Sequence, residues 1–504
     1  MKQFYIVSLL ILFSLSIFSM YQLSPILFII EAFGTSVFNS HNLNASDYTI
    51  LKIEKKINEN GIPLNNNLTL AQCKFPVGHD GFSAEHEQRT NFVIEKVIGG
   101  LRFPTAFVFL DNGDILFLEK DTGQVRRIIN GTMFSQPLIK VNVDKKGENG
   151  MLGIATSKNE KSGKTNIFLY FTEALKGIGG FANNYNASGF ANNYNASANR
   201  IYRYELAGNV LANPELLFDL PRGTSGLHNG GKIVIGPDDN IYVITGDTGD
   251  NTRSAGQNAV EQNGLIKSFD GTSSILKISQ EEDKTLRGNI SSDYIGLKIY
   301  AYGIRNGFGI DFDPITGDLW DTENGPAYGD EINHVKPGFN SGWNKVQGIW
   351  KHTRDDVFPG NSNATYNPPG LLDFNGTGKY RSPEFTWNRT VAPTAIEFLN
   401  SYKLGKQYEN DLFVGDVNNG NLYHFDLIKN RSGLLLNGSL VDKIANSDEE
   451  AKSHIFLSGL GGITDIQVGP DGYLYFSTLG KPYYEEEVSP SSDGSIYRIK
   501  LRSN

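Results

Sequence analysis

A histidine and an aspartate stand at the two ends of a short apolar run, LHNGGKIVIGPDDNIYVITGDTGD, which covers residues 227–250. His228 comes before the run and Asp247 comes after it. If adjacent strands bring them together, the carboxylate holds the imidazole in one tautomer, and the imidazole can then take a proton from a hydroxyl group near neutral pH. The simpler interpretation is that each residue caps its own turn. Spacing alone leaves both interpretations open.

A second polar pair, Arg305 and Asn306, interrupts the aromatic and aliphatic segment YAYGIRNGFGIDFDP. A guanidinium group that is buried without a partner is costly, so Arg305 must meet a carboxylate, a backbone carbonyl or an anionic ligand. The segment therefore predicts either a structural ion pair or a ligand contact.

Acidic residues gather in the segment LWDTENGPAYGDEINHVKPGFNSGW, where Glu323, Asp330 and Glu331 lie among glycines and a proline. Carboxylates and exposed backbone carbonyls suit Ca²⁺, which accepts irregularly placed oxygen ligands. The alternative is a solvated acidic turn.

In a further turn, VDKKGENGMLGIA, Glu148 and Asn149 precede an apolar strand. By itself that turn indicates only a solvated loop.

The elements that must position these residues are short strands that follow turns. Runs rich in β-branched and aromatic residues come after Asp/Asn/Gly/Pro turns, as in LDNGDILFLEK, GPDDNIYVITG, DPITGDLWDTE and GPDGYLYFSTLG. This is the pattern of β-hairpins. The hairpins recur every roughly 60 to 120 residues, which fits four-stranded blades with long loops and predicts an all-β β-propeller over residues 84–504. A β-sandwich is the alternative, although one sandwich rarely uses about 420 residues.

The N-terminal residues predict a location outside the cytoplasm. Residues 1–35 are almost uncharged apart from Lys2 and an acidic residue near their end, and they indicate a signal peptide or a membrane anchor. Residues 36–83 are Asn-rich and predict a linker or stalk.

Cys73 is the only cysteine, so no intramolecular disulfide can form. Triplets of the type Asn-x-Ser/Thr, which could carry glycans or occur by chance, begin at Asn44, Asn67, Asn130, Asn186, Asn195, Asn289, Asn363, Asn375, Asn388, Asn430 and Asn437.

The net charge of the 504-residue chain argues against a nucleic-acid partner. The formal charge is −9 and charged residues make up 20% of the chain, with no basic block. A polyanion would be repelled by such a surface. We therefore expect a small or neutral ligand, and contact with a membrane only through the N-terminal segment.

Taken in order, these segments resemble the soluble quinoprotein glucose/sorbosone dehydrogenases, also called aldose sugar dehydrogenases. The resemblance runs from about Leu101 to Leu501 and implies a six-bladed propeller of four-stranded antiparallel blades. It is carried by GLRFPTAFVFLDNGDILFLEKDTGQVRRI, GENGMLGIA, HNGGKIVIGPDDNIYVITGD, YGIRNGFGIDFDPITGDLWDTENGPAYGDEINHVKPGFNSGW, TVAPTAIEF and ITDIQVGPDGYLYFST.

The resemblance implies that His228 removes the proton of a sugar's anomeric hydroxyl while hydride passes to pyrroloquinoline quinone (PQQ). Asp247 would orient the imidazole, and Arg305 would stabilise charge on the quinone. His228 and Arg305 must then face one cavity at the hub of the blades. The resemblance further implies cofactor contacts from Glu148, Asn149, Arg305, Asn306 and Thr390, and calcium binding by Gly325, Pro326, Asp330 and Glu331.

One departure from the family concerns the carboxylates of PQQ. Family members meet them with a lysine and an Arg-x-Arg pair, whereas this chain has Asn418, Gly462 and Thr464 at those positions. Each missing charge-assisted contact removes about 1.5–3 kcal/mol of binding free energy. Candidate substitutes are Lys232, Arg381, Arg389 and Lys481.

Three functions follow from this pattern as hypotheses. The first is an exported, calcium-dependent quinoprotein that oxidises an aldose to a lactone and passes electrons to an external acceptor. The second is a catalytically silent surface propeller that binds glycan or protein, because the PQQ-carboxylate cations are missing. The third is a calcium-dependent hydrolase of sugar lactones.

Overall fold

The computed structural model describes residues 91–159, 162–174, 198–220, 226–249, 268–269, 271–280, 290–291, 297–352, 370–480 and 493–502. These residues belong to one compact unit, Gly81–Asn504. The predicted N-terminal segment and stalk, Cys73 and Lys481 lie outside the described residues. Within the described part of the chain, no helix is long and apolar enough to cross a membrane. Of the predicted glycosylation positions that are described, Asn130, Asn375, Asn430 and Asn437 are exposed and Asn388 is half-buried.

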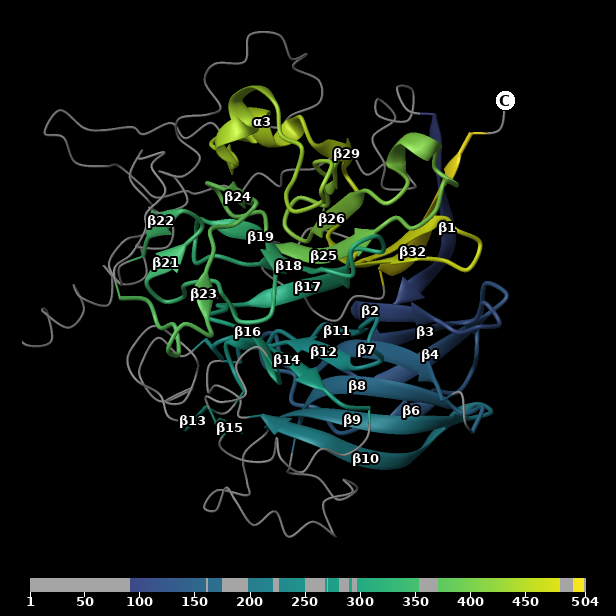
Figure 1. Cartoon of the computed structure of the whole chain (residues 1–504). Helices are drawn as coiled ribbons and strands as arrows, with labels where there is room; N and C mark the ends of the chain where they lie inside the picture. Colours follow the sequence, from purple (N-terminus) through teal and green to yellow (C-terminus); the bar gives the residue numbers. More distant parts are fainter. Residues whose placement is uncertain are drawn as a thin grey trace, which may run out of the picture. The chain divides into compact units, whose positions relative to one another are not determined.

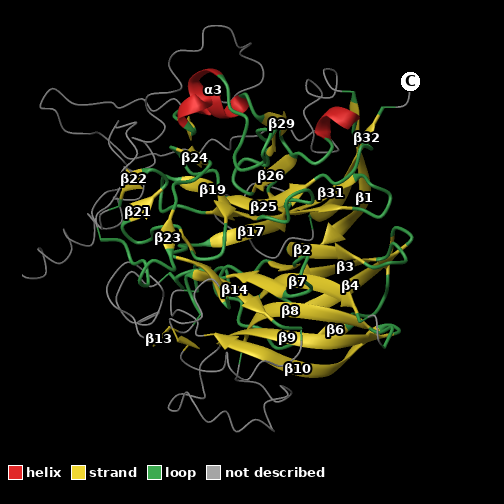
Figure 2. Cartoon of the chain, viewed as in Figure 1, coloured by secondary structure: helices red, strands yellow, loops and turns green. Residues whose placement is uncertain are grey.

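The described chain is an all-β protein with a β-propeller arrangement (Figures 1 and 2). Six of its sheets contain four to six strands. Three of these sheets have four strands each. The first consists of β7 (Met151–Lys158), β8 (Thr165–Glu173), β9 (Ala198–Ala207) and β10 (Val210–Leu220); the second of β25 (Pro393–Phe398), β26 (Leu412–Asp416), β27 (Leu422–Phe425) and β29 (Ile455–Leu457); the third of β30 (Ile463–Val468), β31 (Leu474–Thr478), β32 (Gly494–Leu501) and β1 (Phe92–Leu101).

The other three large sheets carry additional strands, so the prediction of four-stranded blades is wrong for them. Their strands are β2 (Pro104–Phe109), β3 (Ile115–Glu119), β4 (Gln124–Ile129), β5 (Thr132–Met133) and β6 (Ile139–Lys140); β11 (Ile233–Ile235), β12 (Ile241–Ile244), β14 (Ser274–Ile278), β16 (Ile299–Tyr302), β20 (Phe339–Asn340) and β23 (Lys379–Tyr380); and β17 (Gly307–Phe312), β18 (Leu319–Glu323), β19 (Asp330–Val335), β24 (Phe385–Trp387) and β28 (Ile444–Ala445). Strands β20, β23 and β28 join in parallel, contrary to the predicted antiparallel pairing, because each pairs with a strand from which other strands separate it along the chain.

The remaining elements are small. Two further pairs of strands are β13 (Ser268–Phe269) with β15 (Ile290–Ser291) and β21 (Val346–Gln347) with β22 (Trp350–Lys351). Helical structure is limited, within the described residues, to α3 (Asp448–Lys452) and two 3₁₀ turns at Lys406–Tyr408 and Gly438–Asp442.

The innermost strands of the large sheets form a closed series. β2 contacts β7, β7 contacts β11, β11 contacts β17, β17 contacts β25, β25 contacts β30, and β30 contacts β2 again. Pairing of the first described strand, β1, with the last, β32, ties the two ends of this domain together within one sheet (Figure 1). A closed series leaves no inner sheet edge open for pairing with another chain.

The core lies between neighbouring sheets. One buried apolar cluster joins Leu116 of β3 to Ile154 of β7, and another joins Ile332 of β19 to Val414 of β26. Sheets that pack on both faces explain why strands such as β3, with the sequence ILFLE, are buried at every position. The predicted hairpin turns are confirmed; in the turn GPDDN, for example, Gly236 N donates to Asn240 O at 2.8 Å.

Candidate active site

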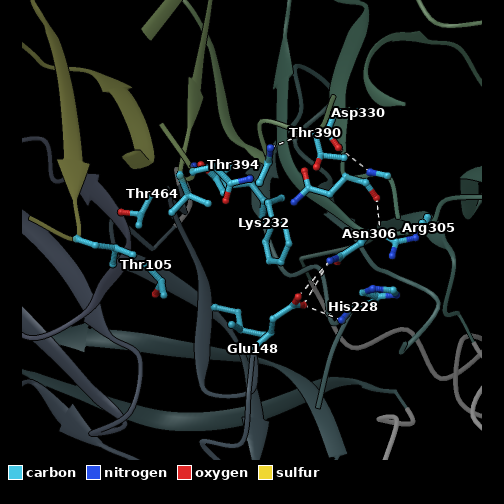
Figure 3. A pocket seen from close by; sticks show the side chains of 18 of the residues that line it. Thr105, Glu148, His228, Lys232, Arg305, Asn306, Asp330, Thr390, Thr394 and Thr464 are labelled. Carbon is cyan, nitrogen blue, oxygen red and sulfur yellow. Dashed lines mark hydrogen bonds between the residues drawn. The ribbon is translucent and has the colours of Figure 1, made fainter. Parts of the chain in front are cut away.

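A cavity of 340 Å³ opens where the inner strands meet (Figure 3). Every large sheet contributes to its wall. The contributing positions include Thr105 of β2, Leu152 of β7, Lys232 just before β11, Phe308 of β17, Thr394 of β25 and Thr464 of β30. Figure 3 places Thr105 and Thr464 on one side of the cavity and His228 and Arg305 on the other.

The predicted pair of His228 and Asp247 forms. His228 Nδ1 lies 2.6 Å from Asp247 Oδ1, and the imidazole lines the cavity. Burial by itself raises the pKa of Asp247, but the hydrogen bond and charge of His228 outweigh it and hold the pKa below its ordinary value. Because the ionised Asp247 accepts from Nδ1–H, the lone pair of His228 is on Nε2. Nε2 has no hydrogen-bond partner among the described residues.

Asp247 lies behind His228 and does not line the cavity itself. Its Oδ1 also accepts from Gly249 N at 2.8 Å, and its Oδ2 accepts from Trp343 Nε1 at 2.8 Å. Three donors therefore hold the carboxylate in place. Trp343 was not anticipated from the sequence, because tryptophan at the end of the NSGW segment is equally typical of a core residue.

His228 has an unusual backbone conformation, with φ of 55°, in the left-handed region. Its N–H donates to Glu148 Oε2 at 2.6 Å, across two sheets (Figure 3). Asn306 Nδ2 donates to the same carboxylate at 3.4 Å. Glu148 thus stabilises a strained turn that carries the imidazole. Asn149, predicted beside it in the pocket, does not line the cavity; it is fully buried, and its Oδ1 accepts from Asn229 Nδ2 at 3.0 Å.

Arg305 lines the cavity on the side of His228. One guanidinium nitrogen donates to Asn324 O at 2.6 Å, and the group lies 5.4 Å above the Trp343 ring. Burial lowers the pKa of Arg305, and the charges of Asp247, Glu148, Asp330 and Glu323 oppose that shift. The guanidinium therefore remains a cation, and it has four acidic side chains around it.

Three buried polar atoms beside the cavity lack a hydrogen-bond partner among the described residues. They are Arg305 Nε, Asn306 Oδ1 and Asn324 Oδ1. All three residues line the cavity. Buried polar atoms normally have partners, so a polar ligand that supplies both acceptors and donors suits this wall.

The predicted calcium residues divide into two groups. Gly325, Pro326 and Asp330 line the cavity, whereas Glu331 does not. Asp330 Oδ1 accepts from Gly325 N at 2.7 Å, and its Oδ2 accepts from Val391 N at 2.6 Å and from Ala392 N at 2.7 Å. These bonds position the loop that carries Thr390, which also lines the cavity. A side chain at Gly325 would place its Cβ 1.8 Å from Tyr328 O, so the loop requires glycine.

Glu331 belongs to a buried acidic group with Glu323, behind Arg305. Ser341 Oγ lies 2.5 Å from Glu323 Oε1 and 3.2 Å from Glu331 Oε2, so it is within hydrogen-bond distance of both carboxyl groups. Burial raises the pKa of Glu323 to about 7 and that of Glu331 well above its ordinary value, with the charge of Glu323 adding to the second shift.

Among the described residues, the group of three side chains that could bind a metal ion does not lie at the cavity. Asp411, His424 and Asp426 have ligand atoms within 4.8 Å of one another. None of them lines the cavity. A cation at Gly325 and Pro326 would therefore depend on their backbone carbonyls together with water or ligand oxygens.

The buried carboxylates predict how stability changes with pH when divalent ions are removed. Burial raises the pKa of Asp311 and Glu323 to about 7, and of Asp330 and Asp416 to about 6. The folded state then binds protons more tightly than the unfolded state, so its stability is greatest at low pH within this window. We expect the free energy of unfolding in EDTA to fall as pH rises from about 4 to about 7, by up to about 1.4 kcal/mol per pH unit and per group.

Denaturant titrations at several pH values measure this trend. Calcium should flatten the decline if the carboxylates bind it, because a cation favours their ionised form. A free energy of unfolding that rises between pH 5 and 7 in EDTA would contradict the raised pKa values of these carboxyl groups.

Two of the three positions that lack the family's cations belong to the cavity wall. Asn418 and Thr464 line the cavity, and Gly462 does not. Of the candidate substitutes, Lys232 lines the cavity, whereas Arg381 and Arg389 are exposed and do not line it. Lys120, which sequence reasoning missed, also lines the cavity. Its signal in the sequence is weak, because a lysine at the end of a strand is usually solvated.

Comparison with known proteins identifies similar sequences. The profile of the glucose/sorbosone dehydrogenase family matches residues 101–482. Quinoprotein glucose dehydrogenase B of Acinetobacter calcoaceticus is 31% identical over 271 residues, which are 51% of this chain and 53% of that protein. Aldose sugar dehydrogenase YliI of Escherichia coli is 24% identical over 387 residues, which are 76% of this chain and 89% of that protein.

A solved structure shows the same fold. The PQQ-bound form of the aldose sugar dehydrogenase from Streptomyces coelicolor superposes with a TM-score of 0.54 at 21% identity. The match covers 81% of this chain and 98% of that one. The described strands and the sequence profile therefore agree on one architecture.

Proposed function

Because the chain belongs to the glucose/sorbosone dehydrogenase family, we propose that it is a quinoprotein oxidoreductase that oxidises the anomeric hydroxyl of an aldose to a lactone. We infer that the six large sheets are the blades of a six-bladed propeller. The observation that carries the proposal is the cavity shared by His228 and Arg305, in which an imidazole nitrogen free to accept a proton faces the same space as a cation.

His228 acts as the general base. Its Nε2 accepts the proton of the anomeric hydroxyl as the carbon that bears this hydroxyl loses a hydride to the electron acceptor. The imidazole becomes positively charged in this step, and the carboxylate of Asp247, 2.6 Å from Nδ1, stabilises that charge. Glu148 keeps the backbone of His228 in its left-handed turn, so the imidazole keeps its direction.

Arg305 and Asn306 hold the electron acceptor. When bound, PQQ supplies the carbonyl carbon that takes the hydride from the sugar. The unpartnered atoms Arg305 Nε and Asn306 Oδ1 fit a polar ring system at this wall, and a cavity of 340 Å³ accommodates a compact tricyclic ligand. Arg305 then stabilises the negative charge that develops on an oxygen of the acceptor.

Calcium and export complete the proposal. Gly325 and Pro326 line the cavity, and their backbone carbonyls would bind a Ca²⁺ ion that adds a second positive charge. Asp330 and Glu331 would organise the surrounding loops. Export is supported by the apolar residues 1–35 and by the exposed Asn-x-Ser/Thr positions, and electrons would pass to an external acceptor.

Reconstitution tests the proposal. The purified protein is incubated with Ca²⁺ and PQQ, and dye reduction is measured with several aldoses. We expect turnover that requires both PQQ and an aldose and that yields a lactone. Absence of quinone binding at micromolar concentration would favour the silent propeller, which the uncharged positions Asn418 and Thr464 support. Lactone hydrolysis without added quinone would instead identify a hydrolase.

A further inference from the structure

Two buried lysines line the cavity from different sheets. Lys120 follows β3 and is 6% exposed, and Lys232 precedes β11 and is 7% exposed. Figure 3 shows Lys232 between the sticks of Glu148 and those of Thr390. Buried lysines are rare unless their ammonium groups have partners. Arg305 is the third cation among the described residues that line this cavity.

Each of the two ammonium groups has more N–H donors than it has hydrogen-bond acceptors among the described residues. Lys120 Nζ donates to Asp121 Oδ1 at 2.8 Å and lies 5.0 Å above the Phe103 ring. Lys232 Nζ donates to Asp465 Oδ1. An ammonium group has three N–H donors. Among the described residues, each lysine therefore has one hydrogen-bond acceptor, which leaves donors for water or for a ligand in the cavity.

Three acidic side chains lie around Lys232. Asp465 is its direct partner, and the carboxylates of Asp311 and Glu397 interact with it electrostatically. Lys120 likewise forms an ion pair with Asp121. A ligand carboxylate would thus join an existing ion pair as a second acceptor, rather than meet an isolated cation.

Two of the four threonines that line the cavity donate their hydroxyl protons to the protein backbone. Thr105 Oγ1 donates to Met151 O at 2.8 Å, and Thr394 Oγ1 donates to Ile463 O at 2.5 Å. Their hydroxyl protons are already used, so these side chains offer acceptor lone pairs to the cavity. A carboxylate is bound best by charged donors, and on this part of the wall these are Lys120 and Lys232.

We propose that Lys120 and Lys232 bind the carboxylates of the quinone, in place of the cations that are absent at Asn418, Gly462 and Thr464. The assignment rests on the proposed function, because it takes PQQ as the ligand. It predicts that the anionic groups of the cofactor point toward the sheets of β3 and β11, and that its quinone oxygens point toward Arg305.

Direct binding tests the assignment without an activity assay. PQQ is titrated into the full-length protein with Ca²⁺, and binding is followed by quenching of tryptophan fluorescence. We expect Lys120→Met and Lys232→Met each to weaken binding by about tenfold or more, which is the usual loss for one charge-assisted hydrogen bond. The trimethyl ester of PQQ should bind the wild type and the variants with similar affinity, because it lacks the anionic groups.

Controls separate binding from folding. Lys158→Met removes an exposed lysine that also pairs with one aspartate, Asp111 at 3.4 Å, and should leave binding unchanged. Lys232→Met combined with Asp465→Asn avoids a buried unpaired carboxylate if the single variant unfolds. Thermal melting checks each variant.

The outcomes distinguish the two proposals. If the wild type binds PQQ and the folded lysine variants bind it equally tightly, the assignment of the lysines is overturned and the proposed function stands. If the wild type binds no PQQ, the proposed function fails together with the assignment. An equal loss of affinity for PQQ and for its trimethyl ester would also overturn the assignment, because it would show a change of cavity shape rather than of charge.

Discussion

Replacing His228 with alanine is expected to lower the turnover of aldose oxidation by about 10²- to 10⁴-fold, because it removes the group that accepts the hydroxyl proton. The imidazole lines the cavity, and its Nε2 is the nitrogen not held by Asp247. Calcium-dependent thermal stability should be retained, since the bond to Glu148 comes from the backbone N–H of residue 228 and remains in alanine. Steady-state dye reduction and melting curves with and without Ca²⁺ measure the two effects.

A second histidine–aspartate pair provides a matched control. His424 Nε2 lies 2.9 Å from Asp411 Oδ2, away from the cavity. His424→Gln breaks that pair and should leave turnover close to the wild-type value. Turnover that survives in His228→Ala would show that another group is the base. Loss of turnover together with loss of the calcium effect on melting would make His228 a scaffold residue.

Replacing Asp247 with asparagine should lower turnover by up to about 10⁴-fold, the loss that a wrong imidazole tautomer can cause. Asp247 Oδ1 accepts from His228 Nδ1–H, and Oδ2 accepts from Trp343 Nε1 at 2.8 Å. When the remaining oxygen of asparagine keeps the bond to Trp343, the amide N–H₂ lies toward His228 and toward Gly249 N, and the bond from Gly249 is lost. Nδ1 must then accept, the ring proton moves to Nε2, and Nε2 can no longer take a proton from the sugar.

Comparison with alanine distinguishes the tautomer from the lost charge. Asp247→Ala removes the carboxylate but presents no donor to Nδ1, so it should retain more turnover than Asp247→Asn. PQQ affinity, measured by fluorescence quenching, should change little in both variants because Asp247 does not line the cavity. Equal turnover in the alanine and asparagine variants would contradict the tautomer argument.

The fold could be predicted where local chemistry specifies it. The turns GPDDN and GPDG lie between strands that pair as antiparallel hairpins, β11 with β12 and β30 with β31. Strands β20, β23 and β28 could not be predicted in this way. They are two residues long and pair in parallel with residues distant in the sequence. Nothing in so short a run indicates its partner.

The site was predictable to a different degree at each residue. His228 and Asp247 flank one hairpin and are 19 positions apart, so pairing of β11 with β12 brings them close. Asn149 sits in the same turn as Glu148, yet only Glu148 reaches the cavity. Adjacent residues in a turn point in different directions, and the direction depends on packing against the next sheet.

By itself, the sequence determined the hairpin strands, their turns and the chemical types of the residues at the cavity, because these depend on neighbours along the chain. Only the tertiary structure decided which distant groups meet. Lys232 pairs with Asp465 across 233 positions, and His228 N–H meets Glu148 across 80. Such contacts exist only when the inner strands close on one another, because that closure results from packing between whole sheets.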